Sequence, residues 1–205
     1  MSQPIPLDPE SIPTQADAET RAMPPSGAEK PATDGARPFR ILMVCLGNIC
    51  RSPTAQGVME QQVAEAGLRG QIQVDSAGTG DYHIGDAPDH RSQEHALKRG
   101  YDISGQRARQ LADADFEEFD LILVMDEANE RDVLARCPRQ HRDKVRRLAV
   151  FGSQPQVLEV PDPYFGGADG FEHVLDLVED ACAGVLARLQ QGADSKMPPA
   201  GGMEG

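Results

Sequence analysis

The sequence contains no uninterrupted apolar run of about eighteen residues, the length that a membrane-spanning helix requires. The first thirty residues also lack the basic start and the apolar stretch of a secretory signal peptide. Cysteines are few, only four, and their uneven spacing does not suggest a disulfide framework. These absences predict a cytoplasmic protein that works in a reducing compartment and has no membrane partner.

Basic residues are also in short supply, with 20 Lys and Arg against 33 Asp and Glu and a formal net charge of −13. An acidic chain is repelled by nucleic-acid phosphates, so no nucleic-acid partner is expected. One basic cluster surrounds Asp143 and consists of Arg136, Arg139, Arg142, Lys144, Arg146 and Arg147. We interpret this cluster as a solvated basic face around a helix end and an edge strand. The alternative is a docking patch for an acidic partner.

The two ends of the chain differ in composition from the middle. Residues 1–38 contain eight prolines and no helical or strand periodicity, and residues 192–205 are mainly Gly, Pro, Ala and Met. Neither end can bury enough apolar surface to offset the entropy lost on ordering. We therefore predict a disordered Pro-rich arm (1–38), a single domain (39–191) and a disordered tail (192–205). The sequence does not determine the oligomeric state, and a monomer is favoured.

Strand-like and helix-like segments alternate along the middle of the chain, which is typical of an α/β fold with a parallel sheet. In such sheets, ligands bind beyond the carboxyl ends of the strands, so the loop after the first strand is a candidate site. The predicted strands are 39–44, 72–76, 121–125 and 145–151. The first predicted helix follows Ser52, which is expected to cap it, and has Pro53 at its first position. The other predicted helices are 89–99, 127–136 and 171–189.

Two cysteines lie in the loop after the first strand, and we compare their spacing with that of three known kinds of site. A zinc site is not expected, because Cys45 and Cys50 lack the further cysteine pair or nearby histidine that would complete it. A thioredoxin-like pair has two intervening residues, whereas four intervene here. A nucleotide P-loop needs a second glycine followed by lysine, and Gly47 stands alone. No metal and no cofactor are therefore predicted.

An anion-binding loop with a cysteine nucleophile fits the same residues better. A loop that leads into a helix presents free backbone amides, and the helix dipole adds to their attraction for negative charge. These donors should hold Cys45 as a thiolate, a nucleophile at neutral pH. Arg51 offers a rigid fork of donors for two phosphate oxygens. Ser52 can donate its hydroxyl to the thiolate, and Asn48 can lock the loop through side-chain hydrogen bonds.

The run Cys-Leu-Gly-Asn-Ile-Cys-Arg-Ser, with Cys45 six residues before Arg51, resembles the signature loop of the low-molecular-weight protein tyrosine phosphatases. The resemblance covers about residues 39–191. It implies a four-stranded parallel sheet with helices on both faces. It also implies hydrolysis of phosphomonoesters through a phosphocysteine, without metal or cofactor, inhibited by phosphate or vanadate. Cys45 would be the nucleophile, Arg51 would bind phosphate, and Ser76 would support the loop. The substrate-binding loop residues would be Leu46, Gly47, Asn48, Ile49, Cys50 and Ser52.

A leaving phenolate departs faster if it receives a proton, so this chemistry requires a carboxylic acid near the thiolate. Asp162 lies between Pro161 and Pro163, which would hold it in a stiff extended loop. A plain turn aspartate is the alternative. Asp162-Pro163-Tyr164 is similar to the family's second motif, which implies that Asp162 acts first as acid and then as base. Asp126 is a rival whose expected task is to cap the next helix, and it is kept as a supporting residue.

The predicted substrate is a phosphotyrosine-containing protein or a small aryl phosphate. Tyr164 and Tyr82 could enclose a phenyl ring from two sides, and Ile49 would form an apolar floor beside the cysteine. The phosphoarginine branch of the family carries threonine at the position of Ile49, so the isoleucine favours phosphotyrosine. The arsenate-reducing branch needs further cysteines near residues 105–120, and none is present there.

Three features leave alternatives open. Many relatives carry, at the position of Gln106, a histidine that organises the hydrogen bonds of the cysteine loop. These hydrogen bonds are therefore expected to be formed differently here. Cys50 either fills the rear of the loop or forms a protective disulfide with an oxidised Cys45. A phosphate-binding or thiol redox-sensing module without turnover is the second functional hypothesis, and Asp162 argues against it because a binder needs no proton donor.

Overall fold

The computed structural model describes residues 37–192. Nearly all of the predicted arm (1–38) and tail (192–205) lies outside these residues, so the prediction of disorder there is not addressed. No helix between residues 37 and 192 is long and apolar enough to cross a membrane. The elements, in chain order, are β1 (Phe39–Cys45), α1 (Arg51–Glu65), β2 (Ile72–Gly78), α2 (His90–Lys98), α3 (Asp115–Glu118), β3 (Leu121–Val124), α4 (Glu127–Arg136), the 3₁₀ turn η1 (Arg139–Lys144), β4 (Val145–Arg147), the 3₁₀ turn η2 (Leu148–Phe151) and α5 (Ala168–Gln191).

The four strands form one parallel sheet in the order β2-β1-β3-β4. The two central strands, β1 and β3, contain the longest buried apolar runs, which suits strands covered on both faces. The chain leaves β1 for β2 on one side and later returns to β3 on the other, so the strand order reverses at β1. The carboxyl end of β1 is therefore the switch point at which open sheets bind ligands. The predicted α/β fold with a four-stranded parallel sheet is confirmed.

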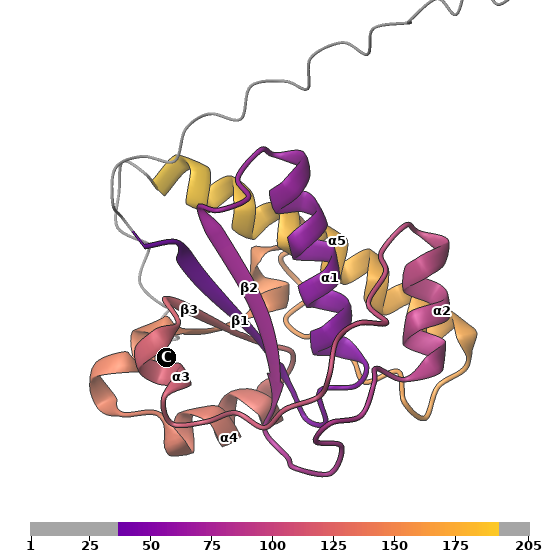
Figure 1. Ribbon diagram of the computed structural model, residues 1–205, viewed down its shortest axis with the longest axis horizontal. Helices are drawn as coiled ribbons and strands as arrows, with labels where there is room; N and C mark the ends of the chain where they lie inside the picture. Colours follow the sequence, from indigo (N-terminus) through magenta and orange to yellow (C-terminus); the bar gives the residue numbers. More distant parts are fainter. Residues whose placement is uncertain (1–36, 193–205) are drawn as a thin grey trace, which may run out of the picture. The chain divides into compact units, whose positions relative to one another are not determined.

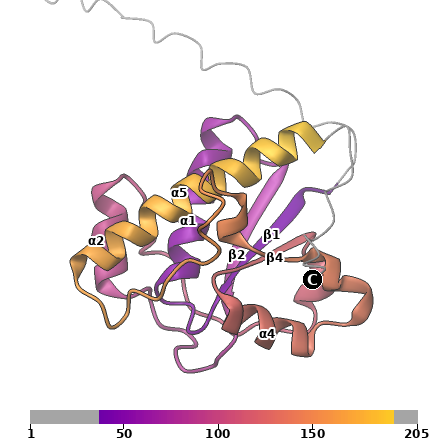
Figure 2. The same ribbon diagram turned by 180° about the vertical axis from the view of Figure 1, so that it is seen from behind.

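Helices cover both faces of the sheet (Figure 1). Alternate side chains of β1 belong to different core clusters, as expected for a strand. Ile41 and Met43 join a core cluster with α1 and α5, whereas Leu42 and Val44 pack with residues of α3 and α4. Figure 2 shows α5 running across the molecule over α1 and alongside α2. The first face thus carries two long helices, and the second carries shorter ones.

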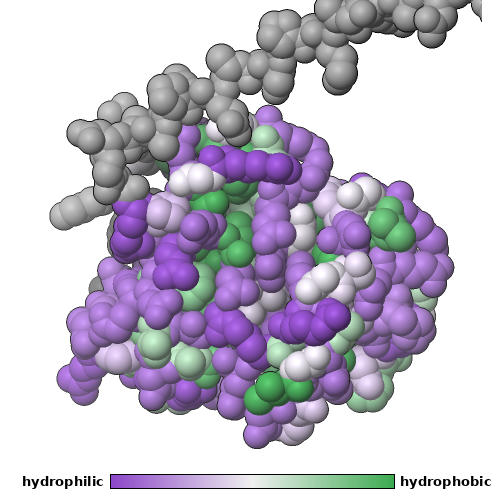
Figure 3. All heavy atoms as spheres, in the orientation of Figure 1, coloured by the Kyte–Doolittle hydropathy of each residue, from purple (hydrophilic) through white to green (hydrophobic). Residues whose placement is uncertain are grey.

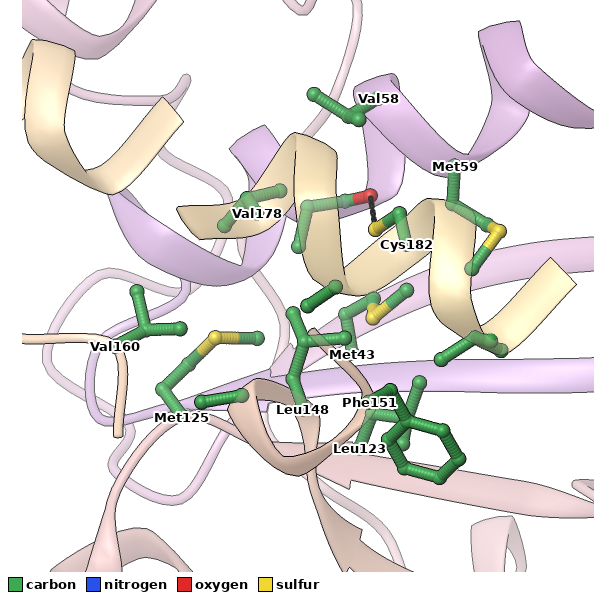
Figure 4. Close-up of a cluster of buried hydrophobic side chains, with 14 of the residues drawn as sticks. Met43, Val58, Met59, Leu123, Met125, Leu148, Phe151, Val160, Val178 and Cys182 are labelled. Atoms are coloured by element: carbon green, nitrogen blue, oxygen red, sulfur yellow. Dashed lines mark hydrogen bonds between the residues drawn. The ribbon is translucent and has the colours of Figure 1, made fainter. Parts of the chain in front are cut away.

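The larger core cluster lies between the sheet and α5 (Figure 4). One close approach within it involves Gly184 of α5, where a Cβ atom would lie only 1.9 Å from the carbonyl oxygen of Phe151. The helix can reach η2 this closely because glycine has no side chain. Residues that Figure 4 labels in the cluster are Met43, Val58, Met59, Leu123, Met125, Leu148, Phe151, Val160, Val178 and Cys182.

Some elements and boundaries differ from the sequence predictions. The fourth strand was predicted over 145–151, but it ends at Arg147 and continues as η2. A strand would turn alternate residues to opposite faces, whereas the 3₁₀ turn brings Leu148, Ala149 and Phe151 into the same core cluster. The last helix begins at Ala168, three residues before the predicted start. The short helix α3 was not predicted.

The basic residues around Asp143 are mostly engaged within the chain. Arg136 donates to the carbonyl oxygen of Leu111 and pairs with Asp113, and Arg147 pairs with Glu130 on α4. The cluster surrounds η1 and the edge strand β4, as expected for a basic face at a helix end and sheet edge.

Candidate active site

Carbonyl groups of the loop between β1 and α1 accept hydrogen bonds from backbone amides of other segments. The amide of Thr79 donates to the carbonyl oxygen of Cys45 at 2.9 Å, and the amide of Asp89 donates to that of Ile49 at 2.8 Å. Within residues 37–192, the amides of Gly47, Ile49 and Cys50 donate to no protein atom. The loop therefore keeps a set of free N–H donors at the N-terminus of α1, where the helix dipole favours an anion.

The sulfur atom of Cys45 is surrounded by hydrogen-bond donors. The amide of Asn48 donates to Sγ at 3.3 Å, and the hydroxyl of Ser52 lies 3.0 Å from it. The Oγ atom of Ser52 accepts from the side-chain amide of Asn48 at 2.9 Å, and its proton can point to the sulfur or, at 3.3 Å, to the carbonyl oxygen of Ala77. Among the described residues, Asn48 is the one non-glycine residue with a positive φ, 56°. Its strained backbone brings its amide to the sulfur.

The prediction that Ser52 caps the first helix is wrong. The helix α1 begins at Arg51, its N-cap is Cys50, and no side chain caps it. The Ser52 hydroxyl is instead occupied by Asn48 and the sulfur of Cys45. A free helix N-terminus suits an anion site, because the amides that a capping side chain would occupy stay available.

Asn48 anchors a longer hydrogen-bonded chain behind the sulfur. Its side-chain nitrogen also donates to the hydroxyl of Ser76 at 2.9 Å, and its side-chain oxygen accepts from the amide of Arg109 at 2.9 Å. Ser76 in turn donates to Oε1 of Gln56 at 2.7 Å. Gln106, at the position where many relatives carry histidine, donates to the carbonyl oxygen of Pro53 instead. Gln56 on α1 therefore supplies the outer end of this chain.

Arg51 brings two carboxylates to the loop. Its side chain is only 3% exposed, and its Nη2 atom lies 2.8 Å from Oδ2 of Asp162. Its Nη1 atom donates to Asp126 and, at 3.3 Å, to the carbonyl oxygen of Val160. Burial alone would lower the pKa of Arg51, but the negative charges of Cys45, Asp162 and Asp126 outweigh it and raise the pKa. The guanidinium is thus a fixed positive charge beside the sulfur.

Asp126 fulfils its predicted structural task and adds another. Its Oδ1 atom accepts from the amide of Asn129 at 2.7 Å and so caps α4, while its Oδ2 atom holds Arg51. One carboxylate therefore fixes both the start of a helix and the orientation of the buried guanidinium.

A cleft of about 210 Å³ opens above Cys45. The sequence did not indicate two of its lining residues, His83 and Phe165. Each directly follows a predicted wall residue, Tyr82 or Tyr164, and this adjacency was the only available signal. The remaining lining residues were all predicted: Cys45, Leu46, Gly47, Ile49, Cys50, Arg51, Tyr82, Asp162 and Tyr164.

The surroundings of the cleft include exposed aromatic side chains. Tyr82 is 73% exposed and Phe165 is 96% exposed. His83 packs against Gly47 and its Nδ1 atom lies 3.1 Å from Asp86. The surface is otherwise mainly hydrophilic, with a small apolar patch at the lower end of the view, beyond the carboxyl ends of the strands (Figure 3).

Comparison with known proteins matches this arrangement to a family. The family model for "Low molecular weight phosphotyrosine protein phosphatase" covers residues 40–195. The chain belongs to this family. As a low-molecular-weight phosphotyrosine protein phosphatase it is a hydrolase, and the resemblance noted in its cysteine loop is confirmed.

Several relatives span nearly the whole phosphatase domain. A Synechocystis protein, whose name assigns it provisionally to the low molecular weight protein-tyrosine-phosphatases, is 52% identical over 152 residues, covering 74% of this chain and 96% of that protein. The Bacillus subtilis low molecular weight protein-tyrosine-phosphatase is 37% identical over 151 residues, covering 74% of this chain and 96% of its own length. A crystal structure of an Entamoeba histolytica protein tyrosine phosphatase superposes with a TM-score of 0.73 at 40% identity, covering 76% of this chain and 99% of that one.

Proposed function

We propose that the phosphatase hydrolyses phosphotyrosine through a phosphocysteine intermediate on Cys45, with Asp162 as general acid and base. The observation that carries this proposal is the geometry around Arg51. The buried guanidinium of Arg51 lies next to the cysteine loop, and its Nη2 atom is 2.8 Å from Oδ2 of Asp162. The nucleophile, the phosphate-binding group and the proton donor thus share one cleft.

In the first step, the phosphate of the substrate binds the free amides of the loop and the fork of Arg51. Asp162 gives up its contact with Arg51 and turns to the leaving oxygen. The thiolate of Cys45 attacks phosphorus, the P–O bond to the phenol breaks, and the leaving oxygen takes the proton of Asp162. The guanidinium and amides stabilise the negative charge of the transferring phosphoryl group.

In the second step, water hydrolyses the phosphocysteine. The carboxylate of Asp162 accepts a proton from the water, whose oxygen attacks phosphorus. The P–S bond breaks, which restores the thiolate of Cys45 and releases inorganic phosphate. No metal or cofactor takes part in this proposed cycle, because sulfur supplies the nucleophile and Arg51 supplies the fixed charge.

The substrate is a phosphotyrosine-containing protein or a small aryl phosphate. Tyr82 and Tyr164 offer flat walls to a phenyl ring, and Ile49 adds an apolar surface near the sulfur. The related Entamoeba structure holds Hepes in its active site, which supports the expectation that phosphate and vanadate compete for the same loop. We place the activity in the cytoplasm, without nucleic-acid or membrane partners.

The activity assay uses purified protein with an aryl phosphate, with and without vanadate. Turnover that vanadate abolishes is expected, and Cys45→Ser should lose turnover while it still binds phosphate. Binding of phosphate without turnover in the parent would favour the alternative, a phosphate-binding or thiol redox-sensing module. Comparing phosphotyrosine, phosphoserine and phosphoarginine peptides then defines the substrate class, and phosphotyrosine should be preferred.

The acid role has its own test in Asp162→Ala. The kcat/KM of the variant, which reports the attack on phosphorus and not the later hydrolysis, should be lower by roughly 100-fold or more with poor leaving groups, because general acid catalysis contributes about 10²–10⁴-fold. Good leaving groups need less protonation and should be affected less. An equal loss across leaving groups would contradict the acid role of Asp162.

A further inference from the structure

We propose that Arg91, in the first turn of α2, is a positioning residue that holds the loop of Asp162 in place against the cysteine loop. The inference depends on the proposed role of Asp162 as general acid. Arg91 itself is outside the cleft lining and acts only through other residues.

On the side of the acid, Arg91 binds the residue that holds the carboxylate. Its Nη1 atom donates to the carbonyl oxygen of Tyr164 at 3.0 Å. The amide of Tyr164 donates to Oδ1 of Asp162, also at 3.0 Å. Tyr164 is therefore fixed at its carbonyl by Arg91 while its N–H group orients the carboxylate. The second oxygen of Asp162 faces Arg51.

The guanidinium also supports the ring of Tyr164, a wall of the cleft. Its central carbon lies 5.3 Å from the centroid of this ring and 4.9 Å from that of Phe171 on α5. Both distances are within the range of cation–π attraction. Phe171 is buried at the start of the long closing helix, so it offers a fixed surface on which Arg91 rests.

On the side of the nucleophile, Arg91 is held by Asp89. Nε and Nη2 of Arg91 lie 3.0 Å and 2.9 Å from the two oxygens of Asp89, a bidentate pair. The backbone amide of Asp89 donates to the carbonyl oxygen of Ile49 in the cysteine loop at 2.8 Å. Hydrogen bonds thus run without a break from the cysteine loop, through Asp89, Arg91 and Tyr164, to Asp162.

This path joins two segments that are more than 100 residues apart in the sequence. A proton donor must lie within hydrogen-bond reach of the leaving oxygen, and a displacement of about 1 Å can cost roughly 100-fold in rate. Lysine cannot replace Arg91 fully, because one ammonium group cannot hold Asp89 with two parallel bonds and reach Tyr164 as well. Loss of Arg91 should therefore impair protonation of the leaving group while the cysteine loop still binds phosphate.

The test measures kcat/KM, which includes the attack on phosphorus but not the later hydrolysis of the phosphocysteine, for aryl phosphates of graded leaving-group acidity in the parent and in Arg91→Ala. With poor leaving groups, kcat/KM should fall about 10- to 100-fold, and with good ones much less. The inhibition constant of inorganic phosphate should stay close to that of the parent. Arg107→Ala is the matched control, because the side chain of Arg107 is exposed and donates only to carbonyl oxygens of its own turn. It should behave as the parent does.

A double-mutant cycle separates positioning from general damage. In an Asp162→Ala background, Arg91→Ala should add little further loss, because both changes remove the same proton transfer. The inference is overturned if Arg91→Ala lowers kcat/KM equally for all leaving groups, or lowers that of Asp162→Ala as much as it lowers that of the parent. If Arg91→Ala does not fold, Arg91→Lys and Asp89→Asn undergo the same comparisons. Inactivity of both the parent and Arg107→Ala would refute the proposed function itself, and this inference with it.

Discussion

Cys45 and Cys50 belong to the same loop but have opposite surroundings. The sulfur of Cys45 faces an amide and a hydroxyl at the base of the cleft. Burial instead raises the pKa of the Cys50 thiol to about 12, so it stays protonated at neutral pH. The sequence alone placed the nucleophile at Cys45 from its spacing to Arg51. It could not show the burial of Cys50, which depends on contacts from other segments.

Mild oxidation should link Cys45 and Cys50 in a disulfide. Peroxide oxidises the Cys45 thiolate to a sulfenic acid, and the thiol of Cys50 then condenses with it, forming the S–S bond and releasing water. The high pKa of Cys50 should make the condensation slow, on a time scale that quenching can follow. Peptide mass spectrometry should detect a Cys45–Cys50 link in the parent and a sulfinic acid at Cys45 in Cys50→Ser. Stable sulfinic acid at Cys45 in the parent would exclude the disulfide.

One helix and one strand, α1 and β2, together fix the orientation of Asn48 behind the sulfur. Oε1 of Gln56 accepts the proton of Ser76, so the oxygen of Ser76 is left to accept from Asn48. The other end of the Gln56 amide is held by Glu60 at 2.9 Å. The direction of each bond follows from the one before it, back to the hydroxyl of Ser52 beside the sulfur.

Gln56→Leu removes the acceptor at the end of this chain and should slow alkylation of Cys45 by iodoacetamide at neutral pH. The expected factor is about three to ten, equivalent to roughly one hydrogen bond of about 1 kcal/mol. Gln56→Glu keeps an acceptor and should stay near the parent. Gln61→Leu is the control, because Gln61 bonds a glutamate one turn along the same helix but has no contact with Ser76. An equal loss in Gln56→Leu and Gln61→Leu would refute the directional role.

The ion pair between Asp89 and Arg91 at the N-terminus of α2 should make the stability of the fold depend on pH. Hydrogen bonds from Arg91 lower the pKa of Asp89 below its ordinary value despite the opposing effect of burial. Such a group stabilises the fold fully above the pKa of an unfolded aspartate, about 3.9, and the contribution disappears as the pH falls through the lower folded value. Asp89→Asn keeps the helix cap but loses the charge. Chemical unfolding should show it less stable than the parent at pH 7, and the difference should shrink below about pH 4. A difference that persists in acid would contradict the charge pairing.

Local patterns predicted most elements but not all of their ends. The predicted helix over 127–136 matches α4 at both ends, because Asp126 caps it and Pro138 follows it. Residues 148–151 were misassigned because an apolar run has the same composition in a buried strand and in a 3₁₀ turn. Ser52 was predicted both to cap the first helix and to donate to the thiolate, and the cap is absent because Asn48 and the sulfur of Cys45 engage its hydroxyl.

The whole molecule explains why so much of the site could be predicted. The strand order reverses at β1, so one contiguous loop after this strand supplies the anion-binding residues. Among the partners from other segments, Asp162 was predicted from its flanking prolines and its likeness to the family's second motif, whereas Arg91 and Gln56 were not predicted. Their contacts depend on how α1, α2 and the loop of Asp162 meet in space, and no local periodicity reports that.

The packing of α5 across the sheet predicts a large effect at Gly184. Alanine at a helical glycine ordinarily stabilises by up to about 1 kcal/mol. Here its Cβ would meet the carbonyl oxygen of Phe151, and overpacking of this kind costs about 1–3 kcal/mol or more. Gly184→Ala should therefore be destabilised by about 2 kcal/mol in denaturant unfolding, whereas Gly105→Ala, with open space around its Cβ, should not. A Gly184→Ala variant as stable as the parent would show that α5 and η2 are packed less tightly.

The central claim is that phosphate is transferred to the sulfur of Cys45. The most direct measurement is rapid quenching of the enzyme, with Asp162→Ala used to slow hydrolysis of the intermediate, during turnover of an aryl phosphate, followed by peptide mass spectrometry. We predict a phosphoryl group on Cys45, formed at a rate that accounts for release of the phenol. Turnover without any phosphocysteine at Cys45, or with the phosphoryl group on another residue, would contradict this mechanism.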